Sequence, residues 1–88
     1  MYTKADITGI VLDFVRRTIP DLKYAEIDTS APLHEIGATS IDMLEVVSAA
    51  MRKLNVDVPR DALGGLGNVD DLVELLLRIV APREAGAA

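Results

Sequence analysis

Apolar residues recur every three or four positions in three long segments of the chain, at 4–19, 40–54 and 68–81. This spacing is typical of amphipathic helices. A short further helix is predicted at 59–63, between Pro59 and a group of glycines. No segment shows the alternation expected of a strand. The pattern therefore predicts an all-α fold, an antiparallel bundle of three main helices plus one short helix, with a long loop between the first and second helices.

Polar residues that favour helix starts precede the three long segments. Thr3 and Asp6 have the spacing of a capping box at the start of the first helix, and Thr39 and Asp42 have it at the start of the second. Asn68 is a favoured N-cap for the last helix. These residues predict helix starts at 4, 40 and 69, so Ser40 is expected at the first position of its helix.

The second predicted helix has two faces when its residues are spaced about 100° apart. The expected core face is Met43, Leu44, Val47, Ala50, Met51 and Leu54. The opposite, polar face is Asp42, Glu45, Ala49, Arg52 and Lys53. Ile41 falls on the polar face, where it is either a docking contact for a partner or a single apolar residue exposed by chance. Asp42 and Glu45 can stabilise the positive start of the helix, form an acidic patch for partners, or do both.

Length and charge restrict the class of protein. The 88 residues are expected to form one domain at 1–81, followed by a flexible tail at 82–88. A formal net charge of −5 argues against nucleic acid as a partner, because phosphate binding needs a basic face. The absence of cysteine excludes disulfides and a thiol nucleophile, and it fits a reducing cytoplasm. Neither a signal peptide nor a segment able to span a bilayer is evident, so we expect a cytoplasmic monomer without a membrane partner.

Ser40 is the candidate functional residue, because an anionic group esterified to it would lie at the positive end of a helix. Its position alone favours an ordinary serine at a helix start. His34 is the only histidine, and we expect it to be a solvated loop residue that does not activate Ser40 as a nucleophile. Asp28, Glu35 and Asp42 lack the spacing of a calcium loop, so no metal site is expected. The chain is therefore predicted to have no catalytic residues and not to be an enzyme.

The segment Gly37-Ala38-Thr39-Ser40-Ile41-Asp42-Met43-Leu44-Glu45 resembles the motif of acyl carrier proteins, a Gly-x-Asp-Ser-Leu element at the start of their second helix. The matching positions are Gly37, Ser40, Ile41, Asp42 and Glu45, with Ile in place of Leu. The resemblance extends along nearly the whole chain. Leu33 and Ile36 match the apolar positions before the glycine, Val58-Pro59 matches the start of the short helix, and 68–72 matches the start of the last one.

This resemblance implies a function for Ser40. It implies that a phosphopantetheinyl transferase attaches 4′-phosphopantetheine to the Ser40 hydroxyl, and that the thiol of this arm holds an acyl group as a thioester. The implied partners are an acyltransferase or acyl-ligase, a ketosynthase or other pathway enzymes. The residues that we expect to dock them are Thr39, Ile41, Asp42, Glu45 and Arg52. The residues implied to line a site for the attached chain are Met43, Leu44, Val47, Met51, Leu63 and Leu72, and the alternative for these is an ordinary place in the core.

Two departures from the family pattern bear on the pathway. Thr39 stands where the family usually has Asp, and Arg52-Lys53 ends a helix that is typically acidic in carriers of primary metabolism. Both departures favour a discrete carrier of polyketide or related natural-product biosynthesis. An aminoacyl or peptidyl carrier is an alternative, although the Gly-Gly-x-Ser pattern common in such carriers is absent. A helical adaptor that binds a protein without any cofactor is a further alternative.

Overall fold

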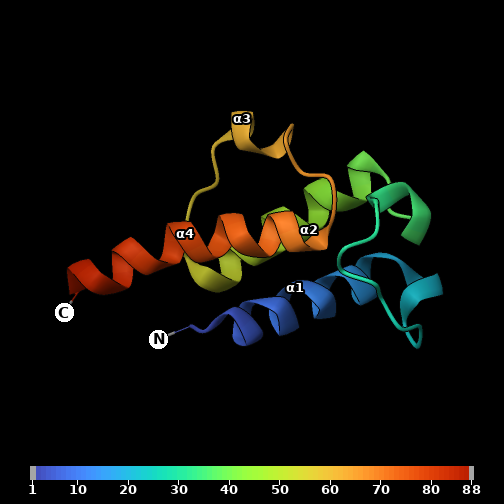
Figure 1. The fold of residues 1–88 in the computed structure, drawn as a ribbon, viewed down its shortest axis with the longest axis horizontal. Helices are drawn as coiled ribbons and strands as arrows, with labels where there is room; N and C mark the ends of the chain where they lie inside the picture. Colours follow the sequence, from blue (N-terminus) through green and yellow to red (C-terminus); the bar gives the residue numbers. More distant parts are fainter. Residues whose placement is uncertain (1, 88) are drawn as a thin grey trace.

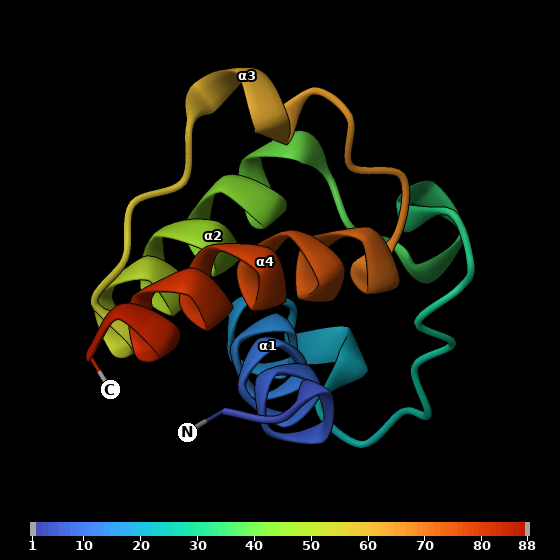
Figure 2. The same ribbon diagram turned by 60° about the vertical axis from the view of Figure 1, so that its left-hand side comes forward.

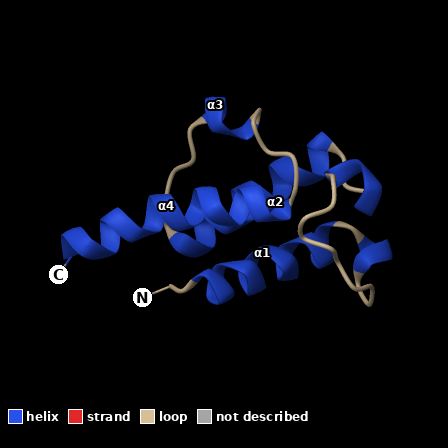
Figure 3. Cartoon of the chain, viewed as in Figure 1, coloured by secondary structure: helices blue, strands red, loops and turns tan. Residues whose placement is uncertain are grey.

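The computed structural model describes the backbone of residues 2–87 and the side chains of residues 2–80. The α-helices are α1 (Lys4–Thr18), α2 (Ser40–Leu54), α3 (Arg60–Leu63) and α4 (Val69–Ala87). Two short 3-10 turns, η1 (Pro20–Leu22) and η2 (Leu33–Ile36), lie in the long connection between α1 and α2. The described residues contain no strand (Figure 3). In Figure 1, α1 runs opposite to α2 and α4, which confirms the predicted helical bundle.

Side-chain caps fix the starts of the long helices as predicted. The Thr39 backbone N–H donates to Asp42 Oδ2 at 3.0 Å, and the Asp42 N–H donates to Thr39 Oγ1 at 3.1 Å. Thr3 and Asp6 form the same reciprocal pair at the start of α1. The Asp71 N–H donates to Asn68 Oδ1 at 2.7 Å. Each pair satisfies backbone donors that a helix start would otherwise leave without partners.

The core is aliphatic and lies where α1 packs against both α2 and α4. Its largest fully buried side chains are Ile7, Val11, Val15, Val46, Val47, Val69, Leu72, Val73 and Leu76. The single phenylalanine, Phe14, is only partly buried against this cluster. Apolar burial of this kind is the main force that holds such a small domain together.

The buried face of α2 differs from the prediction at one position on each edge. Leu44 was expected in the core but is 54% exposed, and Val46 was not expected there but is fully buried. The buried residues 43, 46, 47, 50 and 54 form one stripe at helical spacing. Leu44 lies about 100° around the helix from Met43, so it leaves this stripe and faces the edge of the bundle.

Hydrogen bonds join the long connection to the start of α4. The Asp70 N–H donates to the Thr29 carbonyl at 2.9 Å, and the Leu33 N–H donates to the Gly67 carbonyl at 3.1 Å. The Asn68 side-chain amide donates to the Ser30 carbonyl at 3.2 Å. The apolar residues Ile27, Leu33 and Ile36 of this connection pack partly buried against the core. The connection therefore has a defined path beside α4.

α3 and its flanking segments arch over one side of α2 and α4 (Figure 2). Pro59 precedes the helix as predicted, and the turn of Gly64 and Gly65 follows it. The helical backbone of α4 continues past the predicted end near 81 to Ala87, although the side chains from 81 onward lie outside those described. The division into a domain at 1–81 and a tail at 82–88 remains a prediction. Within the described residues, no helix combines the length and apolar character needed to cross a bilayer.

Candidate functional site

Ser40 is the first residue of α2, and its side chain is exposed. The capping role belongs to the preceding residue, because the Thr39 hydroxyl accepts the Asp42 N–H. The Ser40 hydroxyl forms no hydrogen bond with any residue that the structure describes. The Ser40 hydroxyl is therefore at the helix start without being needed there as a cap.

Backbone N–H groups at the start of α2 are also available to bind an anion. The capping box uses the N–H groups of Thr39 and Asp42, and the Met43 N–H donates to the Thr39 carbonyl. The N–H groups of Ser40 and Ile41 have no hydrogen-bond partner in the described part of the chain. Free N–H groups and the helix dipole both favour negative charge at this end. A phosphodiester on the Ser40 oxygen is compatible with these surroundings.

A tight turn brings the chain to Ser40. Gly37 adopts a left-handed conformation with φ 84° and ψ 15°, and its N–H donates to the His34 carbonyl at 3.2 Å. The Ala38 N–H then donates to the Leu33 carbonyl at 3.0 Å, and the Ala38 side chain is buried. A positive φ costs glycine little, so Gly37 is the residue type that this turn favours.

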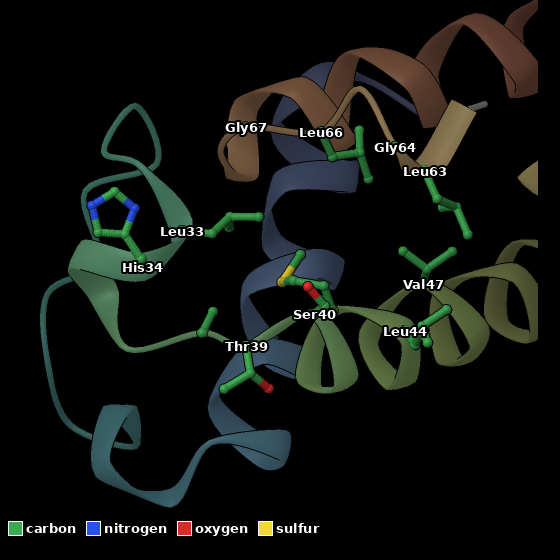
Figure 4. A pocket seen from close by; sticks show the side chains of 12 residues that line it. Leu33, His34, Thr39, Ser40, Leu44, Val47, Leu63, Gly64, Leu66 and Gly67 are labelled. Carbon is green, nitrogen blue, oxygen red and sulfur yellow. The ribbon is translucent and has the colours of Figure 1, made fainter. Parts of the chain in front are cut away.

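An open cavity of about 590 Å³ lies beside Ser40. Its lining residues come from η2, the start of α2 and the segment between α3 and α4: Leu33, His34, Ala38, Thr39, Ser40, Met43, Leu44, Val47, Leu63, Gly64, Leu66 and Gly67. In Figure 4, Leu33 extends into the space between the walls from one side, and Leu63 and Val47 face each other on the other side. The cavity has a mostly apolar lining, and Ser40 is one of its few polar lining residues.

The residues predicted to line a site for the chain attached to Ser40 divide into two groups. Met43, Leu44, Val47 and Leu63 line the cavity as expected. Leu72 does not line it and is fully buried in the core. Met51 does not either, and its sulfur instead accepts the Val58 N–H at 3.2 Å.

Other lining residues were missed by sequence reasoning. Leu33 lies in η2 and Leu66 lies between α3 and α4, and no local periodicity marks either residue as a neighbour of Ser40. Gly64 and Gly67 were interpreted only as helix terminators. His34 is exposed as predicted, but it also lines the cavity. The hydrogen bond between Leu33 and Gly67 brings two of these segments together.

The predicted docking residues lie on α2 or directly before it. Thr39 precedes α2, and Ile41, Asp42, Glu45 and Arg52 lie on it. Ile41 is 72% exposed, which confirms its place on the outer face. Glu45 and Arg52 are exposed too, whereas the Asp42 carboxylate accepts a hydrogen bond in the capping box. Their role in docking remains a prediction.

Ser40 is placed to carry an attached group, and it lacks the partners that would activate it as a nucleophile. No hydrogen bond joins Ser40 to His34 among the contacts of the described residues, so Ser40 lacks the paired base that nucleophilic serines use. No group of three or more His, Asp or Glu side chains in the described residues could hold a metal ion. The site thus defines a small helical protein that presents an accessible serine beside an apolar cavity.

Comparisons with known proteins identify the class. Residues 6–76 match the sequence profile of the family described as "Phosphopantetheine attachment site". The chain belongs to this family of carrier proteins, whose cofactor is covalently attached 4′-phosphopantetheine. The resemblance to acyl carrier proteins is thereby confirmed.

Two individual proteins are similar to the chain. The polyketide biosynthesis acyl-carrier-protein AcpK of Bacillus subtilis (strain 168) is 27% identical over 73 residues, which are 83% of this chain and 89% of AcpK. A chain in the crystal structure of the curacin biosynthetic pathway HMG synthase in complex with acetyl donor-ACP aligns with a TM-score of 0.75. That alignment covers 85% of this chain and 96% of the other at 24% identity, and it confirms the fold.

Proposed function

We propose that Ser40 is the residue that carries 4′-phosphopantetheine, and that the chain holds an acyl group for polyketide or related natural-product biosynthesis. One observation carries the assignment of Ser40. Its hydroxyl is exposed at the start of α2 while Thr39 performs the capping, so Ser40 can be esterified without loss of the cap.

The surroundings of Ser40 suit the group chemically. The N–H groups of Ser40 and Ile41 remain for a phosphodiester at the positive end of α2. When attached, phosphopantetheine supplies a thiol that can hold an acyl group as a thioester, and the chain itself contains no cysteine. The role of the protein itself is to hold the attachment point in a fixed place and to present it to other proteins.

The cavity beside Ser40 supports a second role for the chain. Leu33, Met43, Val47 and Leu63 form an apolar wall next to the attachment point. Burial of apolar surface favours contact between such a wall and a hydrocarbon group, by about 25 cal/mol for each Å² removed from water. We infer that an acyl group on the arm is sheltered there between encounters with enzymes.

A relative and the charges on α2 both support a role in polyketide or related natural-product biosynthesis. AcpK is named as a polyketide biosynthesis carrier, and this chain aligns with most of its length. Thr39 and the exposed Arg52 and Lys53 leave the outer face of α2 less negative than an all-acidic helix. An aminoacyl carrier or a cofactor-free adaptor has no comparable support.

The partners that we propose are a phosphopantetheinyl transferase, an acyltransferase or acyl-ligase, and a ketosynthase or another enzyme of the pathway. The net charge of −5 disfavours nucleic acid. The chain acts in this proposal as a cytoplasmic monomer without a membrane partner. It has no catalytic residue of its own, and the chemistry takes place on its partners.

Attachment can be tested by intact mass spectrometry. The folded protein is incubated with coenzyme A and a broad-specificity phosphopantetheinyl transferase until the reaction is complete. The expected result is a gain of one phosphopantetheine on the wild type and on Ser48→Ala, a matched control with a serine removed elsewhere on α2. Ser40→Ala should gain nothing, and an unmodified wild type would refute the proposal.

A further inference from the structure

Met51 connects the end of α2 to the segment that leads into α3. Its carbonyl accepts the Val56 N–H at 3.1 Å, and its Sδ accepts the Val58 N–H at 3.2 Å. Val56 is partly buried and Val58 is 9% exposed, so both pack against the core beside these bonds. One residue thus fixes the path of the chain between Asn55, which ends α2, and Pro59, which precedes α3.

Few other hydrogen bonds hold α3 in place. Among the described residues, the backbone hydrogen bonds of residues 59–66 stay within that segment. Bonds to other elements are made before it at Met51 and after it at Gly67. Leu63 of α3 lines the cavity beside Ser40. The position of this part of the cavity wall therefore depends on the bonds of Met51.

The Met51 side chain is also open to small molecules. It is partly exposed and lines a surface pocket of about 400 Å³ at the end of α2. The other residues of this pocket are Ser48, Arg52, Asn55, Val56 and Asp57. A thioether sulfur has two lone pairs. One accepts the Val58 N–H, and the other remains for an oxidant.

We propose that Met51 is a site of reversible oxidation by peroxide, and that its sulfoxide releases the start of α3. A sulfur lone pair attacks one oxygen of hydrogen peroxide, and the S–O bond forms as the O–O bond breaks. The second oxygen takes the proton of the first and leaves as water. Sulfur loses two electrons to the peroxide, and methionine sulfoxide reductases reverse the change. This inference goes beyond the proposed carrier function, because the site is complete without phosphopantetheine.

Oxidation removes the acceptor that the Val58 N–H uses. The sulfur of a sulfoxide carries a partial positive charge, so it does not attract an N–H donor. The Val58 N–H has no other partner among the described residues, and an unpaired donor beside the core is costly. The sulfoxide is also polar where the Met51 side chain packs against the core. The chain before α3 is therefore expected to move away from Met51, and Leu63 with it.

A simpler role for Met51 is that of a flexible side chain that fills a gap in the core. Met43 on the same helix separates the two roles. It is 6% exposed, and its sulfur accepts no hydrogen bond from any residue that the structure describes. If oxidation acts through the bond to sulfur, only oxidised Met51 frees Val58. Met51→Leu and Met43→Leu are matched substitutions, because leucine keeps the volume and lacks the sulfur.

The test uses the protein without phosphopantetheine. The wild type, Met51→Leu and Met43→Leu are treated with dilute hydrogen peroxide, and peptide mass spectrometry locates each sulfoxide. Amide exchange measured by NMR then reports on Val58. The amide of Val11, a fully buried residue of α1, is the control for global unfolding.

Met51 should be oxidised about fivefold faster than Met43, because susceptibility follows exposure. Oxidation should speed exchange at Val58 about five- to tenfold, leave Val11 unchanged, and be reversed by a methionine sulfoxide reductase. Met51→Leu should show fast Val58 exchange before treatment and no response to peroxide, whereas Met43→Leu should respond as the wild type does.

Three results would overturn the proposal. They are a Met51 that stays reduced while Met43 is oxidised, an unchanged Val58 exchange rate in the oxidised protein, and an equal acceleration at Val11. Failure of the carrier function is a separate result, because it is measured as the absence of a mass gain at Ser40.

Discussion

The backbone N–H of Leu33 donates to the carbonyl of Gly67 at 3.1 Å, which joins two segments that both line the cavity beside Ser40. The neighbouring side chain of Asn68 strengthens this connection. Its oxygen accepts the Asp71 N–H at 2.7 Å, and its amide donates to the Ser30 carbonyl at 3.2 Å. One side chain thus caps α4 and holds the long connection beside it.

Substitutions at Asn68 should separate these two roles. Asn68→Ala removes both bonds, and it is expected to lower the free energy of unfolding by about 1 kcal/mol, the usual cost of a lost N-cap. Asn68→Asp keeps the acceptor for α4 but loses the donor to Ser30, so its loss should be smaller. Urea unfolding gives the stabilities, and amide exchange at Leu33 should be faster in both variants. Equal loss in the two variants would show that the cap contributes little.

Thr39, rather than Ser40, should be the residue on which the stability of α2 depends. Thr39→Ala removes the acceptor of the Asp42 N–H and is expected to cost about 1 kcal/mol. Thr39→Ser keeps the hydroxyl and should remain close to the wild type. Thermal unfolding measures both variants, and mass spectrometry should still show phosphopantetheine on Ser40 in the folded protein. If Thr39→Ala loses no stability, the Ser40 hydroxyl has replaced the cap.

Local features of the fold could be predicted because they depend on neighbours in the sequence. The capping pairs Thr3–Asp6 and Thr39–Asp42 are three residues apart, and their geometry follows from helix formation alone. Asn55 ends α2 in a left-handed conformation with φ 55°, which asparagine tolerates. The exposure of Ile41 followed from helical periodicity in the same way.

Features set by packing between distant segments could not be predicted. Which edge of α2 is buried depends on where α1 and α4 contact it, so Val46 was missed and Leu44 was misplaced. The cavity depends on Leu33 and Leu66, which come near Ser40 through bonds between loops rather than through any pattern in the sequence.

Substitution by alanine should lower the free energy of unfolding at Gly37 and raise it at Gly9. An added Cβ meets nothing within 4 Å at either Gly37 or Gly9, so steric contact does not distinguish them. Gly37 has φ 84°, and alanine there is expected to cost about 1 kcal/mol through backbone strain. Gly9 lies inside α1, where alanine should add about 0.5–1 kcal/mol. Chemical denaturation of both variants checks the pair, and a stabilising Gly37→Ala would contradict the left-handed turn before Ser40.

The carboxyl group of Asp28 should make the long connection sensitive to acid. The Ser30 hydroxyl donates to Asp28 Oδ1 at 2.6 Å and the Ser30 N–H donates to it at 2.9 Å. These bonds favour the ionised form and lower the pKa of Asp28 below its usual value of 3.8. A carboxyl with a lowered pKa stabilises the fold above its unfolded pKa, and this contribution is lost as the pH falls through the lower, folded pKa.

The stability difference between the wild type and Asp28→Asn should therefore be constant near neutral pH and shrink as the pH falls below 3.8. Ser30→Ala removes the hydroxyl donor, so the pKa of Asp28 should rise toward its usual value. An NMR titration of the Asp28 carboxyl gives the pKa in both proteins, and urea unfolding across the acid range gives the stabilities. The hydrogen bonds do not act as described if Asp28 titrates at the same pH with and without the Ser30 hydroxyl.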